Sequence, residues 1–302
     1  MQSLVYFKAL ADETRLRLLN LLLLREFNVA ELMEILDMGQ SRVSRHLRIL
    51  SDSALVRSRK DGLWAFYAPA EEGEGRRFLT AVGYLLEGEP FASDRRRAEE
   101  AAAAGRRRKR RFFDALAEDW EEMKRSIIGS LDLGAEIIAR LPACRAAADL
   151  GCGTGDLLPL LETRAETVIG VDSSPRMLDL AAQRLTAASG KGLELRLGEI
   201  EHLPLRDREV DWAVISMVLH HLPEPRTGLI ETGRACRRGL ILVELARHQD
   251  ESLRSRFGDH WLGFERRQLE TWLIEAGFTV SESRTYALKK NLTALLYTAR
   301  NT

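Results

Sequence analysis

Residues 146–161 read AAADLGCGTGDLLPLL. The apolar start predicts a short strand that ends near Asp149, the glycines a tight turn, and the leucines a helix. Gly151, Gly153 and Gly155 would let the backbone approach a ligand closely at the carboxyl end of the first strand of a parallel sheet, where such folds bind nucleotides. The segment therefore predicts an α/β doubly wound domain with a ligand site at its glycine turn.

A second strand is expected at residues 168–171, and it ends in Asp172, whose carboxylate can accept hydrogen bonds from both hydroxyls of a ribose. A dinucleotide-binding fingerprint would need glycine or alanine where the chain has Asp156, so the glycine turn does not match that fingerprint. Further strands are predicted at residues 193–197, 210–216, 240–244, 278–283 and 291–297. The short connection between the last two predicts an antiparallel hairpin at one edge of the sheet.

The N-terminal part of the chain predicts three short helices. Asp12 can cap the first, Asn28 can cap the second in a capping box with Glu31, and Ser41 can cap the third after the turn at Gly39. The third helix buries its apolar stripe and turns basic residues outward. A helix, a glycine turn and a basic helix in this order predict a helix-turn-helix.

Residues 55–67 predict a two-stranded hairpin with its turn at Asp61 and Gly62, which makes the domain an α+β winged helix. We expect DNA contacts from the third helix and from this wing. A solvated charged face is the alternative interpretation. The candidate DNA-binding residues are Gln40, Ser41, Arg42, Ser44, Arg45, His46, Arg48, Arg57, Arg59 and Lys60.

With 302 residues, of which 45% are hydrophobic, the chain can bury two cores, and its 45 basic and 45 acidic residues balance. We expect a DNA-binding and dimerisation domain at 1–90, a basic connector helix at 91–111 and the α/β domain at 112–302. The run RRRKRR at 106–111 could contact DNA phosphates or be a solvated connector, and both interpretations stay open.

Cys144, Cys152 and Cys236 form no C-x-x-C pair, which argues against disulfides and structural zinc. The N-terminus lacks the pattern of a signal peptide, and the leucine-rich stretch at 19–24 is too short to span a bilayer. We therefore expect a cytoplasmic protein with no membrane partner and no metal site.

Three stretches carry a family resemblance: ALADETRLRLLNLL at 9–22, SRVSRHLRIL at 41–50 and LVRSRKDGLWAFYAP at 55–69. They resemble the ArsR family of winged-helix repressors over residues 1 to about 70. The resemblance implies a homodimer that reads palindromic double-stranded operator DNA. It also implies a metal site on thiolates, but the chain has EFNVAEL at 26–32, with no cysteine there, and this departure argues against thiolate metal sensing in this domain.

Four stretches of the second half, DLGCGTG (149–155), VIGVDSSPRMLDLA (168–181), LGEIEHLPL (197–205) and VDWAVISMVLHHL (210–222), are similar to class I S-adenosylmethionine-dependent methyltransferases, particularly those of quinone biosynthesis. The resemblance implies that the chain binds S-adenosylmethionine or S-adenosylhomocysteine. Matched residue by residue, it assigns Asp149, Gly151, Gly153 and Gly155 to the methionine moiety, Asp172 to the ribose, Ser173 and Met177 to the adenosine, Glu199 and Ile200 to the adenine, and Ser216 to the pocket floor.

Two functions remain. The first, which we favour, is a transcriptional repressor whose methyltransferase-like domain senses S-adenosylhomocysteine or S-adenosylmethionine; fused proteins of this kind resemble regulators of methionine-cycle genes. The second is an active methyltransferase on a small molecule that regulates its own operon.

For an enzyme, His220 and His221 are weak catalytic candidates that could equally serve packing, and Phe112, Phe113 and Trp120 could form a lid or pack in the core. The three cysteines do not match the pattern of arsenite methyltransferases. A polar acceptor pocket would favour the enzyme, and an apolar one the sensor.

Overall fold

The computed structural model describes residues 2–61, 64–185 and 192–302. These residues form two compact units, which divide between Arg107 and Arg108. The expected turn at Asp61 and Gly62 lies partly outside the described residues. Within the described ranges, every helix is too short or too polar to cross a membrane.

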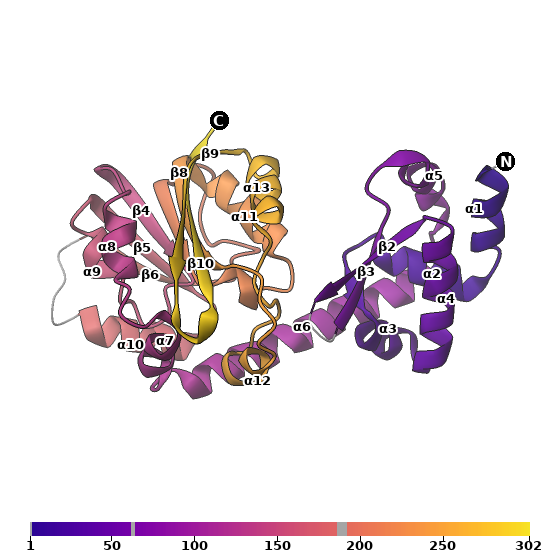
Figure 1. The fold of residues 1–302 in the computed structure, drawn as a ribbon, viewed down its shortest axis with the longest axis horizontal. Helices are drawn as coiled ribbons and strands as arrows, with labels where there is room; N and C mark the ends of the chain where they lie inside the picture. Colours follow the sequence, from indigo (N-terminus) through magenta and orange to yellow (C-terminus); the bar gives the residue numbers. More distant parts are fainter. Residues whose placement is uncertain (1, 62–63, 186–191) are drawn as a thin grey trace. The chain divides into compact units, whose positions relative to one another are not determined.

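The first unit packs short helices against a small antiparallel sheet (Figure 1). Its core is built from leucines such as Leu18, Leu32 and Leu47, which three successive helices contribute and which are completely buried. The sheet has the order β1-β3-β2, so that the wing strands pair directly, as expected. The elements are α1 (Gln2–Leu10), α2 (Glu13–Leu22), β1 (Phe27–Asn28), α3 (Val29–Leu36), α4 (Gln40–Asp52), β2 (Val56–Asp61), β3 (Trp64–Pro69), α5 (Gly73–Val82) and the 3₁₀ turn η1 (Gly83–Leu85).

Two of the three expected helix caps are confirmed. The Asp12 side chain accepts a hydrogen bond from the backbone N–H of Arg15, and Asn28 forms a complete capping box with Glu31. The expectation for Ser41 is wrong, because α4 begins at Gln40 and its N-cap is Gly39, which has no side chain to cap with. Ser41 already lies inside the first helical turn.

Helix α6 (Phe91–Leu116) crosses the boundary between the two units. Its start packs in the first unit, where Arg17 donates two hydrogen bonds of 2.7 Å to the carboxylate of Asp94. Asp94 is only 1% exposed, and a buried charge of this kind is tolerated because a bidentate guanidinium pairs with it. This ion pair fixes the first turn of α6 to α2.

The second unit is built on a seven-stranded sheet of order β6-β5-β4-β7-β8-β10-β9. The pairs among the first five strands are parallel, and β10 pairs antiparallel with both β8 and β9. This confirms the predicted doubly wound sheet with an antiparallel hairpin at one edge. Its strands are β4 (Cys144–Leu150), β5 (Ala165–Asp172), β6 (Leu193–Leu197), β7 (Val210–Ser216), β8 (Cys236–Leu245), β9 (Phe278–Ala287) and β10 (Thr293–Asn301).

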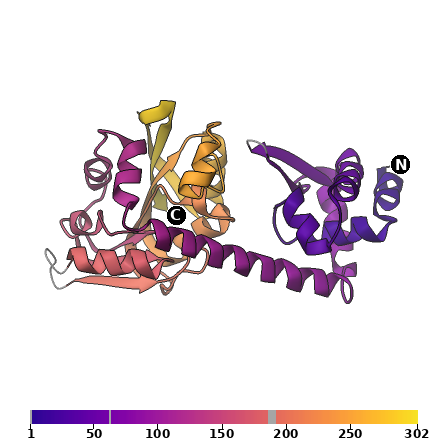
Figure 2. The same ribbon diagram turned by 90° about the horizontal axis from the view of Figure 1, so that it is seen from below.

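Helices cover both faces of this sheet (Figure 1). One face packs on α11 and α13 through residues such as Leu229 and Leu269, and the other on α8 and α9 through Ile137 and Leu158. In Figure 2, α10 lies along the edge strand β6. The helices are α7 (Trp120–Ile128), α8 (Leu133–Ile138), α9 (Leu158–Leu161), α10 (Pro175–Leu185), η2 (Leu219–His221), α11 (Pro225–Ala235), α12 (Ser252–Phe257), α13 (Arg266–Glu275) and η3 (Lys289–Asn291).

The capping box gives a test of the first unit. We expect Asn28→Ala to lower the free energy of unfolding by about 1 kcal/mol, because two backbone N–H groups lose their partners. Ser41→Ala is the matched control and should leave stability unchanged, since Ser41 does not cap α4. Urea unfolding followed by circular dichroism measures both, and equal losses in the two variants would contradict the assignment.

Candidate functional site

The loop after β4 has the backbone shape that only glycine adopts freely. Gly151, Gly153 and Gly155 have φ of 80°, 53° and 78°. A Cβ atom added at Gly151 would lie 2.6 Å from a methyl group of Val218, and one added at Gly155 would lie 2.9 Å from the Cβ of Ala181. The loop therefore packs too closely for side chains and presents its backbone at the carboxyl edge of the sheet.

Asp172, the last residue of β5, ties this loop to the neighbouring strand. Its Oδ2 accepts a hydrogen bond of 2.9 Å from the backbone N–H of Gly153, and its Oδ1 accepts one of 2.8 Å from that of Ser174. Burial raises the pKa of Asp172, while these backbone donors oppose the shift. The backbone of Ser173 also donates to this carboxylate. A carboxylate has about four lone-pair sites, so about one remains for a ligand.

The other residues expected around an adenosine follow the carboxyl ends of successive parallel strands. Met177 is 2% exposed, and Ile200 is buried, where it packs toward Gly228. Ser173, Glu199 and Ser216 are half-buried. The fold thus brings the predicted residues to one edge of the sheet, and their contacts with a ligand stay predictions.

A cavity of about 40 Å³ lies beside the glycine loop. Trp120 joins the two, because its Nε1 lies 3.5 Å from a Cβ built at Gly153, and it also lines the cavity. Phe113 packs edge-on against Trp120 and His221, with ring centroids 5.6 and 5.1 Å away, whereas Phe112 packs toward Gly258. The cavity is lined by Trp120, Lys124, Ile127, Ile128, Met217, His220, His221, Leu245, Leu253, Phe257 and Asp259.

His220 and His221 are the last two residues of η2, which follows β7 after a short connection, and both are buried. The Nδ1 of His220 lies 2.7 Å from a carboxylate oxygen of Glu244. Burial lowers the pKa of His221 well below its usual value, whereas for His220 the carboxylates of Glu244 and Asp259 outweigh burial and raise the pKa. The cavity therefore has a polar wall among mostly apolar residues.

The acidic residues that face this histidine pair were not predicted from the sequence. Asp259 lies in the loop after α12, far along the chain from the histidines. No spacing in the sequence connects it to them. Glu244 offers a weak signal, because an acidic residue inside the apolar strand ILVEL needs buried partners.

Lys109 differs from the rest of the basic run at 106–111, whose role the sequence analysis left open. Its neighbours in the run are exposed, whereas Lys109 is half-buried in the second unit. Burial lowers the pKa of Lys109 to about 8, and the charges of Glu201 and Asp259 oppose this shift. At least this one cation of the run therefore interacts with the second unit's own acidic groups.

The candidate DNA-binding surface lies on α4 and the wing. Of the predicted helix residues, Ser44 and His46 are half-buried, and the following are exposed: Gln40, Ser41, Arg42, Arg45 and Arg48. On the wing, Arg57 pairs with Glu71, and Lys60 is exposed. Arg59 pairs with Glu26 at 2.6 Å, so part of its charge is neutralised within the domain.

None of the three cysteines is placed to be a thiolate. Cys152 lies buried in the glycine loop and Cys236 at the start of β8, and Cys144 is half-buried. Burial raises the pKa of all three thiols, that of Cys236 to about 12.

Comparison with known proteins gives two separate matches. Residues 12–58 match the model of the bacterial regulatory protein family arsR, and residues 148–243 match that of the methyltransferase domain. The first unit carries an ArsR-family helix-turn-helix, and the second is a methyltransferase domain.

Individual relatives repeat this division. The arsenical resistance operon repressor of Escherichia coli K12 is 48% identical over 62 residues, which are 20% of this chain and 53% of the repressor. The demethylmenaquinone methyltransferase of Lactiplantibacillus plantarum is 36% identical over 107 residues, 34% of this chain and 45% of the enzyme. The chain thus spans about half of the length of these curated relatives.

A solved structure supports the fold of the methyltransferase domain. A candidate methyltransferase from Bacillus halodurans C-125 aligns with a TM-score of 0.50 at 15% identity, over 57% of this chain and 99% of that one. At this identity the likeness concerns the fold.

Asp149 gives a pH-dependent test of the site. Burial, followed by the charge of Asp156, raises its pKa to about 8. Between about pH 4 and pH 8 this carboxyl group is protonated in the folded state and ionised in the unfolded state, so its contribution makes stability fall as the pH rises. We expect Asp149→Asn to remove up to about 1.4 kcal/mol of free energy of unfolding per pH unit from this slope.

Urea unfolding of the methyltransferase domain at several pH values measures this slope. Asp179→Asn is the control, because Asp179 is exposed on α10 and should not alter the slope. An unchanged slope in Asp149→Asn would show that Asp149 is ionised in the folded protein.

Proposed function

We propose that the chain is a DNA-binding transcriptional regulator, with the action of a repressor, whose methyltransferase domain binds S-adenosylhomocysteine or S-adenosylmethionine as its signal. The observation that carries the proposal is the joining of the glycine loop to Asp172 through the backbone of Gly153. This arrangement offers backbone groups and a carboxylate at the edge of the sheet where doubly wound folds bind nucleotides. Genes of the methionine and S-adenosylmethionine cycle are the proposed targets.

The exposed face of α4 supports binding to double-stranded operator DNA. Arg42, Arg45 and Arg48 project from the second helix of the helix-turn-helix, the one that enters the major groove in this class of proteins. The name of the Escherichia coli relative, an operon repressor, agrees with this role. Such a regulator acts in the cytoplasm.

Exposed apolar residues support a homodimer. Leu4 and Phe7 on α1 are 52% and 59% exposed, and Tyr84 and Leu85 in η1 are 68% and 62% exposed. Phe7 packs edge-on against Phe78 of α5, so α1 and α5 share one surface. Large exposed apolar side chains on neighbouring elements are typical of a protein interface, and two-fold dimers read palindromic sites.

S-adenosylhomocysteine is the signal we favour. It differs from S-adenosylmethionine by one methyl group and one positive charge, so a site can distinguish the two electrostatically. The ligand must bind the DNA-competent and DNA-incompetent states with different affinities if it is to control the regulator. The accumulating product of methyl transfer would then report on the cycle.

A second function, methyl transfer to a small molecule, is favoured by one observation. His220, His221 and Asp259 place polar groups in the wall of the cavity beside the glycine loop, where a methyl acceptor would lie. The printed name of the Lactiplantibacillus plantarum relative, a demethylmenaquinone methyltransferase, agrees with such an activity.

Titration calorimetry with each ligand, followed by a DNA-binding assay on the promoter upstream of the gene, distinguishes the two functions. Selective binding of S-adenosylhomocysteine that changes the affinity for DNA supports the regulator. Comparable binding of both ligands with no effect on DNA would contradict the sensor and favour the enzyme.

The ribose assignment has its own variant. We expect Asp172→Ala to lose binding of both ligands in calorimetry, because the carboxylate at the end of β5 is removed, while DNA binding is kept. Asp179→Ala, on the exposed face of α10, is the control and should bind normally. Normal ligand affinity in Asp172→Ala would remove Asp172 from the site.

The DNA interface is tested on α4. We expect Arg45→Ala to weaken operator binding by about 1 to 3 kcal/mol if Arg45 reads a base edge. Arg206→Ala is a matched loss of one exposed arginine, outside the helix-turn-helix, and should bind normally. A gel-shift titration in which the two variants bind equally well would exclude a base contact by Arg45.

A further inference from the structure

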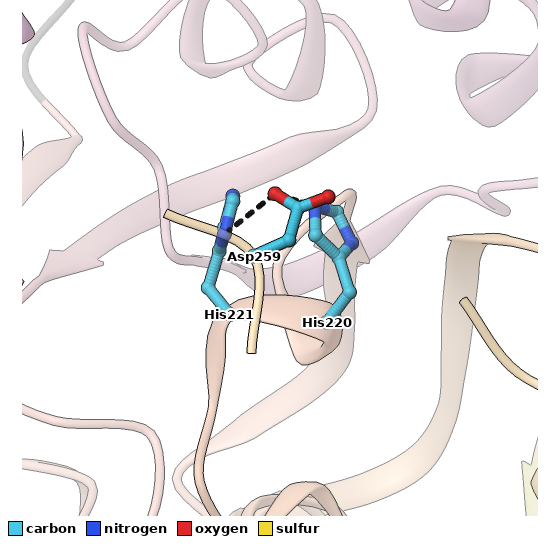
Figure 3. A group of neighbouring side chains, drawn as sticks. All are labelled: His220, His221 and Asp259. Carbon is cyan, nitrogen blue, oxygen red and sulfur yellow. Dashed lines mark ion pairs between the residues drawn. The ribbon is translucent and has the colours of Figure 1, made fainter. Parts of the chain in front are cut away.

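His220, His221 and Asp259 gather at one wall of the cavity (Figure 3). The Nδ1 of His221 lies 3.5 Å from Oδ1 of Asp259, and the Nε2 of His220 lies 3.9 Å from the same oxygen. One ligand atom from each of the three residues lies within 4.8 Å of the others. Ligands that share one tetrahedral ion at about 2.0–2.2 Å are roughly 3.3–3.6 Å apart, so small movements suffice for all three to bind one ion.

Two of these atoms lack partners. Among the described residues, neither Nδ1 of His221 nor Oδ1 of Asp259 has a hydrogen-bond partner, although both are buried. A buried polar group without a partner costs about 1 to 3 kcal/mol, and an ion or water that satisfies both would remove this cost. The two atoms face each other across the gap, as Figure 3 shows.

The Nδ1 of His220, the nitrogen turned away from Asp259, contacts a carboxylate, as the second nitrogen of a metal-binding histidine usually does. This Nδ1 is bonded to Glu244, and the Glu244 carboxylate also accepts hydrogen bonds from the backbone N–H groups of Val218 and Leu219. With Nδ1 on Glu244, the ring nitrogen of His220 that faces Asp259 is Nε2. Carboxylate, histidine and metal are commonly connected in this order.

The charges and the space around the cluster also suit a cation. Glu244 and Asp259 are two carboxylates with side chains only 0% and 2% exposed. The cations Lys109 and Arg254 act on Asp259, and Lys124, which also lines the cavity, pairs with Asp156. The cavity of about 40 Å³ has room for an ion and a water.

We propose that His220 Nε2, His221 Nδ1 and Asp259 Oδ1 bind a divalent transition-metal ion of the Zn²⁺, Co²⁺ or Fe²⁺ class, with Glu244 as a positioning residue. Three protein ligands leave a position open on the cavity side, as in catalytic metal sites, where an oxygen, nitrogen or sulfur atom of a small molecule can bind. The ion would hold such a molecule beside the glycine loop. This site is independent of the proposed regulatory function, since binding of the ion needs neither DNA nor the adenosyl ligand.

Cobalt is the probe, because its visible spectrum reports both the binding and the ligand set. The full chain is stripped with a chelator, dialysed and titrated with Co²⁺ without DNA or adenosyl ligand. We expect one ion per chain, with the bands of nitrogen and oxygen ligands and no thiolate charge-transfer band, and Zn²⁺ should displace it. No stoichiometric binding would overturn the proposal and leave a water between His221 and Asp259.

Variants assign the ligands. Asp259→Asn and His221→Ala should each lose the cobalt bands, and Glu244→Gln should weaken Co²⁺ binding by about 10- to 100-fold while the spectrum keeps its shape. His202→Ala removes an exposed histidine outside the cluster and is the matched control. Equal binding in the control and in Asp259→Asn would place the ion elsewhere and overturn the site.

Thermal unfolding of the unaltered chain covers the case in which these variants do not fold. A ligand that binds only the folded state stabilises it, so stripping the metal should lower the unfolding temperature of the methyltransferase domain and adding Zn²⁺ should restore it. An unfolding temperature that does not respond to either treatment would contradict the proposal. Calorimetry with S-adenosylhomocysteine on the same stripped sample reports the proposed regulatory site separately.

Discussion

The buried carboxylate of Glu244 is the group on which the architecture around the cavity depends. It is completely buried near the end of β8, and its oxygens accept hydrogen bonds from the backbone N–H groups of Val218, Leu219 and Leu245 as well as meeting His220. A buried carboxyl group can remain in the core only if such donors replace water. The backbone that leaves β7 must therefore turn toward β8, and this turn places the histidine pair.

The glycine loop likewise depends on a carboxyl group that accepts hydrogen bonds from the backbone, at the other side of β4. Asp172 accepts hydrogen bonds from the backbone of Gly153 and of Ser174, so the ends of β4 and β5 are joined through a side chain. The side chain of Val218 then fills the space that a Cβ at Gly151 would need. The turn after β7 thus contacts the loop after β4. The glycine loop and the wall of the cavity therefore pack against each other.

Much of this fold could be predicted because its signals are local. The strands at 193–197 and 210–216 coincide with β6 and β7, and the capping box at Asn28 is present as predicted. The helix α1 and the two-residue strand β1 were missed, since α1 has no capping signal and β1 exists only through its pairing with β3. Ser41 was misplaced because serine is a common cap, whereas the chain enters α4 through Gly39.

The site divides in the same way. The glycines and Asp172 lie in contiguous motifs at strand ends, so their neighbourhood follows from the parallel sheet. Asp259, Glu244 and Lys109 reach the histidines from three other parts of the chain. Their role results from tertiary packing, and no spacing in the sequence encodes it.

The burial of the three thiols has a consequence for how the protein responds to oxidants and electrophiles. Reaction with peroxide, a disulfide or an alkylating agent requires a thiolate, and near neutral pH each of these cysteines keeps its proton because burial raises its pKa. Cys152 is the instructive case, because a modified sulfur in the glycine loop would block that loop. Its burial and its raised pKa therefore make Cys152 a poor target for such reagents.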